Sequence, residues 1–144
     1  MARDGDLRSI FRRRLPRFHW NSIETAGTGR GIPDAEFCYN GKTAWIEFKV
    51  TMAWSVDLRA EQVAWLMRRA RAGGRCWVAV RRQSPGGPRK GLPADELWLV
   101  SGDNAAALKR EGLKCGSLTR VWVHEGGPAR WDWDVIGKVL LSDA

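Results

Sequence analysis

The chain has no run of apolar residues long enough to cross a membrane. No stretch of its 144 residues approaches the roughly 20 apolar residues that a membrane helix needs. The first residues, MARDGDLRSIFRRR, also lack the apolar core of a secretory signal peptide. We therefore expect a cytoplasmic protein with no membrane partner.

Cysteine and histidine are scarce, which argues against a structural zinc site and a disulfide framework. The chain has three cysteines and two histidines, namely Cys38, Cys76, Cys115, His19 and His124. They form no CxxC pair and no cysteine–histidine pair at zinc-binding spacing. We expect three reduced, partly buried thiols. Neither histidine is assigned a catalytic role.

The glycine-rich segment at 25–33, TAGTGRGIP, lacks the features of a nucleotide-binding loop. No GK[ST] follows it, and it precedes an expected strand where a dinucleotide-binding fingerprint would precede a helix. We interpret it as a flexible approach to that strand, with Arg30 and backbone N–H groups able to meet a phosphate. No small-molecule cofactor is expected.

Positive charge and tryptophan are abundant. The net charge is +8, which points to a polyanionic partner. Hydrophobic residues make up 44% of the chain, enough for a packed core, and the length fits a single domain over residues 1–144. Most of the nine tryptophans are expected in the core or half-buried.

The stretch from Gly31 to Lys49, GIPDAEFCYNGKTAWIEFK, predicts a β-hairpin. Asn40-Gly41 is a strong signal for a two-residue turn, because both turn positions need a positive φ. With those two residues as the loop, Ala35 faces Ile46 and Asp34 faces Glu47. Alternation then sets Asp34, Glu47 and Lys49 on one face, opposite an apolar core face.

Two facing carboxylates suggest a metal site. Their Cβ atoms would lie roughly 5 Å apart and their charges would repel, whereas a hard divalent cation would make the arrangement favourable. Asp34 and Glu47 are therefore predicted to hold Mg²⁺, joined by the backbone carbonyl of Phe48. Lys49 would orient an attacking water or stabilise the transition state of phosphodiester hydrolysis.

The remaining pattern predicts an α/β domain with a central mixed sheet flanked by helices. Apolar spacing favours a first helix from about residue 4 that Pro16 ends or kinks, with Asp4 or Asp6 as its cap. A helix at 58–72 and a strand at 75–82 imply a right-handed crossover that places this strand parallel to the hairpin. Further elements are a strand at 96–100, a helix to about 110, a strand or extended arm at 121–124, and a helix at 132–141.

Basic side chains recur in the first helix, in the helix after the hairpin and in the Pro/Gly-rich loop at 83–92. They suit contacts with phosphate groups. The candidates are Arg8, Arg12, Arg13, Arg30, Arg68, Arg89 and Lys90.

The motif GIPD, followed by twelve residues and EFK, resembles the PD-(D/E)xK nuclease superfamily. The wider pattern over about residues 20 to 82 is similar to its VRR-NUC branch, which lies close to the Holliday-junction resolvases and includes small phage nucleases. The resemblance implies a restriction-endonuclease-like sheet, dependence on Mg²⁺ or Mn²⁺, and cleavage leaving a 5′-phosphate. It also implies action in the bacterial cytosol or, for a phage protein, in the host cytoplasm.

The resemblance assigns roles residue by residue. Asp34, Glu47 and Lys49 match the catalytic motif. Glu24 matches an upstream acidic metal ligand, and Gln62 matches a glutamine that supports the lysine or the water.

Three functional hypotheses remain open from the sequence. The first is a structure-selective endonuclease for branched DNA that acts as a homodimer, with exposed tryptophans in the dimer interface. The second is a restriction-like, nicking or RNA nuclease of the same chemistry. The third is a nucleic-acid-binding module without hydrolysis, against which the opposed carboxylates argue.

Overall fold

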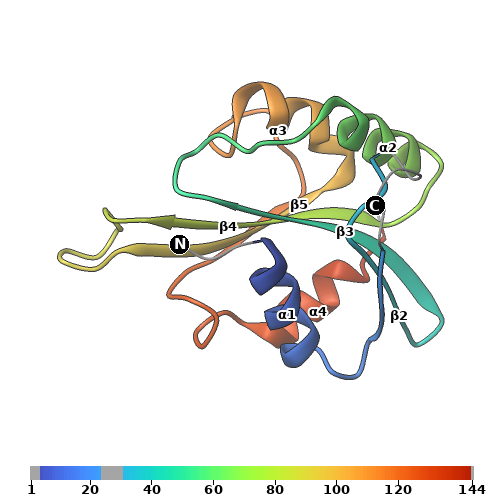
Figure 1. Cartoon of the computed structure of the whole chain (residues 1–144), viewed down its shortest axis with the longest axis horizontal. Helices are drawn as coiled ribbons and strands as arrows, with labels where there is room; N and C mark the ends of the chain where they lie inside the picture. Colours follow the sequence, from blue (N-terminus) through green and yellow to red (C-terminus); the bar gives the residue numbers. More distant parts are fainter. Residues whose placement is uncertain (1–3, 24–30, 144) are drawn as a thin grey trace.

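The computed structural model describes residues 4–23 and 31–143, which form a six-stranded sheet with helices on both faces (Figure 1). The strands follow one another across the sheet in chain order: β1 (His19–Ser22), β2 (Ala35–Tyr39), β3 (Lys42–Thr51), β4 (Cys76–Ser84), β5 (Ala94–Ser101) and β6 (Val121–His124). Strands β3 and β4 run parallel, and the other neighbouring pairs in this sheet run antiparallel. The predicted mixed α/β sheet is confirmed.

The β2–β3 hairpin has the register predicted from its turn. Asn40 and Gly41 have φ values of 52° and 79°, as a type I′ turn requires. Tyr39 pairs with Lys42 and Ala35 pairs with Ile46. The turn chemistry therefore fixes which hairpin side chains share a face.

Helix α2 (Ala60–Arg71) provides the crossover from β3 to the parallel strand β4. The side-chain carbonyl of Gln62 accepts a hydrogen bond from the Arg59 N–H at 3.0 Å and caps the first turn. Gly73, with φ of 88°, follows the helix and ends it in a left-handed conformation. This crossover brings the first turn of α2 to the sheet beside β3.

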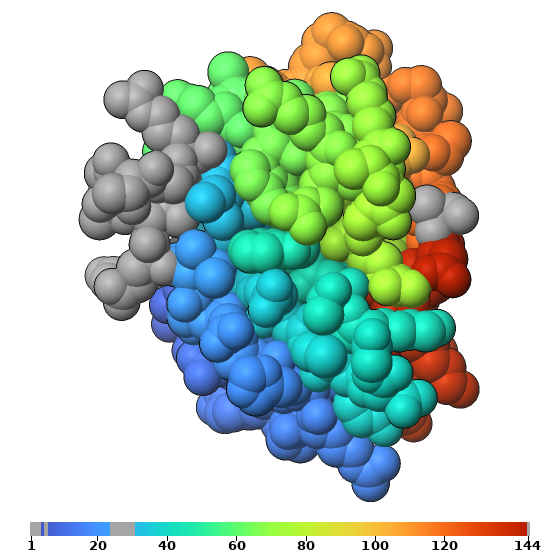
Figure 2. All heavy atoms as spheres, turned by 90° about the vertical axis from the view of Figure 1, so that its right-hand side faces the viewer, coloured from blue at the N-terminus to red at the C-terminus, as the bar shows by residue number. Residues whose placement is uncertain are grey.

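The sheet separates two apolar cores. Helices α1 (Asp4–Arg14) and α4 (Trp133–Leu140) cover one face, where Phe11, Phe37, Phe48 and Ile136 are fully buried (Figure 1). Helices α2 and α3 (Ala105–Glu111) cover the other face over a second cluster that includes Leu66 and Val78. Figure 2 shows α2, in light green, lying above the hairpin, in cyan.

Most predicted elements agree with the structure, with some differences in extent. The segment at 19–22 forms β1 on the sheet edge, and the segment at 121–124 forms strand β6, which resolves the choice between a strand and an extended arm. Strand β5 is longer than predicted, and a 3₁₀ turn at Gly102–Asn104 precedes α3.

The prediction that most tryptophans lie in the core or are half-buried is confirmed. All nine tryptophans lie within the described residues, and each is buried or half-buried. Their indole rings pack on one another and on arginine side chains, as Trp45 does with Trp65 and Arg69. The three cysteines are free thiols, and Cys76 is buried. Among the described helices, none combines the length and apolar character of a membrane span.

Candidate active site

Asp34 lies immediately before β2, where the hairpin approaches the first turn of α2. Continuing the observed register by one pair sets it opposite Glu47, as predicted. Its carboxylate oxygen Oδ2 accepts a hydrogen bond from the Phe48 N–H at 2.9 Å, and its backbone carbonyl accepts one from the Ile23 N–H. These bonds hold the Asp34 carboxylate against β3.

Glu47 is the buried acid of this site, with 3% of its surface exposed. Its Oε2 accepts a hydrogen bond from Gln62 Nε2 at 2.9 Å and lies 3.7 Å from Lys49 Nζ. Its other oxygen, Oε1, is buried with no hydrogen-bond partner in the described structure. A buried carboxylate oxygen without a partner is costly, and a cation ligand would satisfy it.

The surroundings of Glu47 favour its protonated form. Burial, and next the negative charge of Asp34, raise its pKa from 4.5 to about 8, although Lys49 acts in the opposite direction. The carboxyl group therefore retains its proton over part of the neutral range. A divalent cation bound there would displace that proton.

Gly31 sets the distance between this site and α2. Its φ is +79°, and a Cβ at this position would lie 2.1 Å from the backbone oxygen of Glu61 in the first turn of α2. Only a residue without a side chain allows this approach. The segment that leads to Asp34 is therefore packed directly on the helix that supplies Gln62.

Pro33 affects which groups can hydrogen-bond to the backbone carbonyl of Phe48, which is also a predicted metal ligand. Continuing the antiparallel register by two pairs sets Pro33 opposite Phe48. In an antiparallel ladder, the facing residues of every second pair exchange N–H to carbonyl bonds, and proline has no N–H to donate at such a position. Pro33 therefore cannot occupy the Phe48 carbonyl, while the Phe48 N–H is taken by Asp34.

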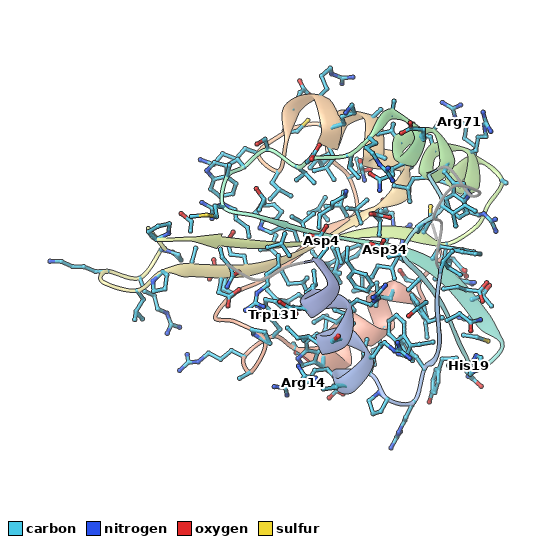
Figure 3. The ribbon with its side chains drawn as sticks, in the orientation of Figure 1. Asp4, Arg14, His19, Asp34, Arg71 and Trp131 are labelled. Atoms are coloured by element: carbon cyan, nitrogen blue, oxygen red, sulfur yellow. The ribbon has the colours of Figure 1, made fainter. Side chains whose placement is uncertain are left out.

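Asp4, at the start of α1, interacts electrostatically with Lys49 and Asp34, which sequence reasoning missed. Although Asp4 as a whole is exposed, partial loss of contact with water raises the pKa of its carboxyl group. The charge of Lys49 and a hydrogen bond from the Val50 backbone lower this pKa. Asp34 is among the charges that act on it, and Figure 3 labels both residues near the middle of the sheet. From the sequence, Asp4 is only a candidate helix cap, because its approach to β3 depends on how α1 packs.

The structure brings some predicted residues together and leaves others apart. Asp34, Glu47, Lys49 and Gln62 form one cluster. Glu24 and Arg30 lie outside the described residues. Arg89 and Lys90 are exposed on the loop between β4 and β5, which projects to the left edge of Figure 1, away from Asp34 in Figure 3.

The other predicted basic residues lie on helices. On α1, Arg8 is half-buried, while Arg12 and Arg13 are exposed. Arg12 donates a hydrogen bond to Ser22 Oγ at 3.1 Å, which ties α1 to β1. Arg68 is exposed in the last turns of α2.

The donor set partly fits a divalent cation. Within residues 4–23 and 31–143, no group of three or more histidine, cysteine or acidic side chains is close enough to hold a metal ion. Two carboxylates are present, however, and one carries the buried unpaired oxygen of Glu47. Oxygen donors of this kind suit Mg²⁺, which commonly uses one or two carboxylates and completes its shell with water and substrate.

A scan against protein-family models finds no match to this chain, and a search of curated proteins finds none either. The assignment of the site therefore depends on its own residues and geometry.

Proposed function

We propose that this protein is a metal-dependent endonuclease that hydrolyses DNA phosphodiester bonds. One observation carries the proposal: Glu47 is buried beside Asp34, with one oxygen held by Gln62 near Lys49 and the other unpaired. This arrangement is unfavourable in a folded protein unless a cation or substrate uses it, because it sets two carboxyl groups side by side and leaves a buried polar atom unsatisfied. Carboxyl groups with strongly shifted pKa values are typical of functional sites.

Each residue has a distinct task in the proposed reaction. Asp34 and Glu47 would hold Mg²⁺ or Mn²⁺ together with the Phe48 carbonyl, and Glu24 is a further candidate ligand. The bound cation would activate water and neutralise charge on the phosphate. Lys49, with 15% of its side chain exposed, would donate hydrogen bonds to the attacking water or to the phosphate oxygens. Gln62 acts as a positioning residue because it fixes Oε2 of Glu47.

The proposed substrate is branched DNA, cut by a homodimer. The net charge of +8 and the exposed arginines of α1 and α2 favour a polyanion. Two symmetric cuts in a four-way junction require two copies of a single-site chain. The action on branched DNA and the homodimer are both part of the proposal.

The test is a cleavage assay in Mg²⁺ on linear, flapped, nicked, single-stranded and four-way DNA, with an RNA duplex included. We expect cleavage of branched substrates, at least about a 100-fold loss of rate for Lys49→Ala and Asp34→Asn, and no activity in excess EDTA. Asp34→Asn keeps an oxygen that can accept the Phe48 N–H, so it separates the loss of charge from the loss of that bond.

Arg110→Ala is the matched control, because Arg110 is an exposed cation on α3 and is none of the site residues. It should cleave at the wild-type rate. Unchanged cleavage by Lys49→Ala and Asp34→Asn, or activity that persists in EDTA, would refute the site assignment. Equal cleavage of linear and branched duplexes, or a monomer by gel filtration with and without DNA, would refute the branched-DNA homodimer.

A further inference from the structure

A hollow of about 680 Å³ lies between the end of α1, the tip of the β2–β3 hairpin and α4. It is on the sheet face covered by α1 and α4. Figure 3 shows Arg14, one of its lining residues, at the opposite end of α1 from Asp4. The hollow is therefore separate from the cluster of Asp34, Glu47 and Lys49.

The wall of the hollow is aromatic. Phe18 is buried and stacks on Phe37, with ring centroids 5.1 Å apart and planes 8° apart. Tyr39 packs on Phe18 at 5.4 Å and remains 36% exposed. Packing thus holds the Tyr39 ring in place while leaving part of it accessible, which is what a base-stacking platform needs.

The rim of the hollow is mostly positive. Arg14, Arg17 and Lys138 are exposed lining residues, and Asp134 is the acidic one. Three cations thus stand against one carboxylate, at the edge of an aromatic wall. A ligand that carries both negatively charged groups and planar aromatic rings would complement these cations and the aromatic wall.

Helix α1 connects the hollow with the candidate active site. Its eleven residues span about 16 Å. Asp4 at its start interacts electrostatically with Lys49 and Asp34, and Arg14 at its end lines the hollow. The exposed side chains of Arg12 and Arg13 lie on the same helix between these two ends.

We propose that the hollow binds an unpaired base of a single-stranded segment of the substrate, with Tyr39 stacking on the base and the basic rim contacting adjacent phosphates. A single strand is favoured because the bases of an intact duplex are stacked on one another and cannot offer a face to Tyr39. The inference builds on the proposed action on nucleic acid, and it specifies that the substrate has an unpaired segment beyond the cleaved bond.

The experiment measures binding by fluorescence anisotropy in EDTA, where no hydrolysis is needed. Three labelled duplexes are compared: one with a single-stranded thymidine tail, one with an abasic tail of equal phosphate number, and one with blunt ends. Wild-type protein should bind the thymidine tail at least about fivefold more tightly than the abasic tail. Tyr39→Ala should abolish this difference and leave the blunt duplex unaffected.

Two further variants make the test specific. Tyr39→Phe keeps the ring and should bind as wild type, whereas Lys138→Glu should weaken binding of both tails because it reverses a rim charge. Arg110→Ala removes an exposed cation on α3 and should leave the preference for the thymidine tail unchanged. Circular dichroism of Tyr39→Ala checks that the fold is intact.

Equal binding of thymidine and abasic tails by the wild-type protein would overturn the inference. A Tyr39→Ala protein that keeps the preference for bases would also overturn it. So would displacement of the thymidine tail by polyglutamate at equal charge concentration, because that result would indicate an acidic protein partner. Failure of this test leaves the cleavage proposal standing, because cleavage is tested by Lys49→Ala and Asp34→Asn. Loss of the cleavage proposal would likewise leave the tail measurement valid.

Discussion

At Glu47, the charged form that would hold a cation is the form that burial disfavours. Its carboxyl lies among Asp34, Lys49 and Gln62, and its pKa is raised to about 8. Without a bound cation, the folded chain must therefore either keep a proton on Glu47 or carry a poorly solvated charge. Both conditions make the stability of the protein depend on pH.

Glu47→Gln should remove this dependence. A carboxyl group with a raised folded-state pKa contributes full stability below its unfolded value near 4.5, and that stability is lost as the pH rises towards 8. Between pH 5 and pH 9 in EDTA, the variant should therefore gain stability relative to the wild type, on the order of a few kcal/mol. Urea unfolding monitored by tryptophan fluorescence measures the difference at each pH.

Cleavage provides the second measurement on Glu47→Gln, since a neutral amide is a poor ligand for Mg²⁺. The variant should be inactive while being more stable at high pH. Lys42→Gln is a suitable control, because Lys42 is exposed near the hairpin turn and should leave the pH dependence unchanged. A stability difference between Glu47→Gln and wild type that stays constant with pH would contradict the raised pKa.

The sequence was sufficient to predict that Asp34, Glu47 and Lys49 converge, because the Asn40-Gly41 turn sets the hairpin register. It was not sufficient to predict that Glu47 is buried. Alternation shows which face a side chain takes, but only the packing of α2 determines that this face is covered. The proximity of Asp4 was hidden for the same reason, since it depends on contact between α1 and β3.

At the scale of elements, the segment before β2 and the first turn of α2 form a single unit. Gly31 touches the backbone of Glu61, and the next residue along α2 is Gln62, which holds Glu47. A change in the distance between these two segments would move Gln62 away from Oε2. The separation of the segments is therefore part of the site geometry.

Gly31→Ala should disrupt this unit, because the new Cβ would lie 2.1 Å from the Glu61 oxygen and the residue has φ of +79°. We expect a loss of about 2–4 kcal/mol of stability, with impaired cleavage. Gly41→Ala is the matched control, since Gly41 has the same φ but no atom within 4 Å of the added Cβ. It should lose only about 1 kcal/mol, from backbone strain alone.

Urea unfolding of the two variants gives the comparison. Equal losses of stability would show that backbone conformation, and not contact with α2, determines the cost at Gly31. Full cleavage by a folded Gly31→Ala protein would show that α2 need not stay in place for the site to work.

Elements with strong local signals were predicted well. The end of α1 is marked by Pro16, and the end of α2 by Gly73-Gly74. The hairpin turn is marked by Asn40-Gly41. Strand β1 was indistinct because its four residues are mostly exposed, with no alternation of apolar and polar side chains. It is a strand because β2 offers an edge with which to pair, a long-range contact that no local pattern contains.

Over the whole molecule, positive side chains are spread across several surfaces. Exposed arginines occur on α1 and α2, and further cations occur on the loop between β4 and β5. Binding of DNA that uses several of these side chains would release counterions. The affinity for a blunt duplex should then fall by roughly a thousandfold between about 50 and 200 mM salt.

Anisotropy titrations in EDTA at several salt concentrations give the slope of affinity against salt. Asp34→Asn should show the same slope as the wild type, because its carboxylate belongs to the proposed metal site and not to the basic surfaces. A slope near zero would contradict binding of DNA through these surfaces, whatever the outcome of the cleavage assays.

Pro33 gives the backbone of the candidate site an unusual property. Proline next to a strand usually limits unwanted pairing between sheets. Here its missing N–H removes one possible hydrogen-bond donor to the Phe48 carbonyl, which we propose as a metal ligand. A residue other than proline at position 33 would supply an N–H that could compete with the proposed metal ion for this oxygen. The proposed role of the Phe48 carbonyl as a metal ligand therefore depends on the backbone N–H that proline lacks.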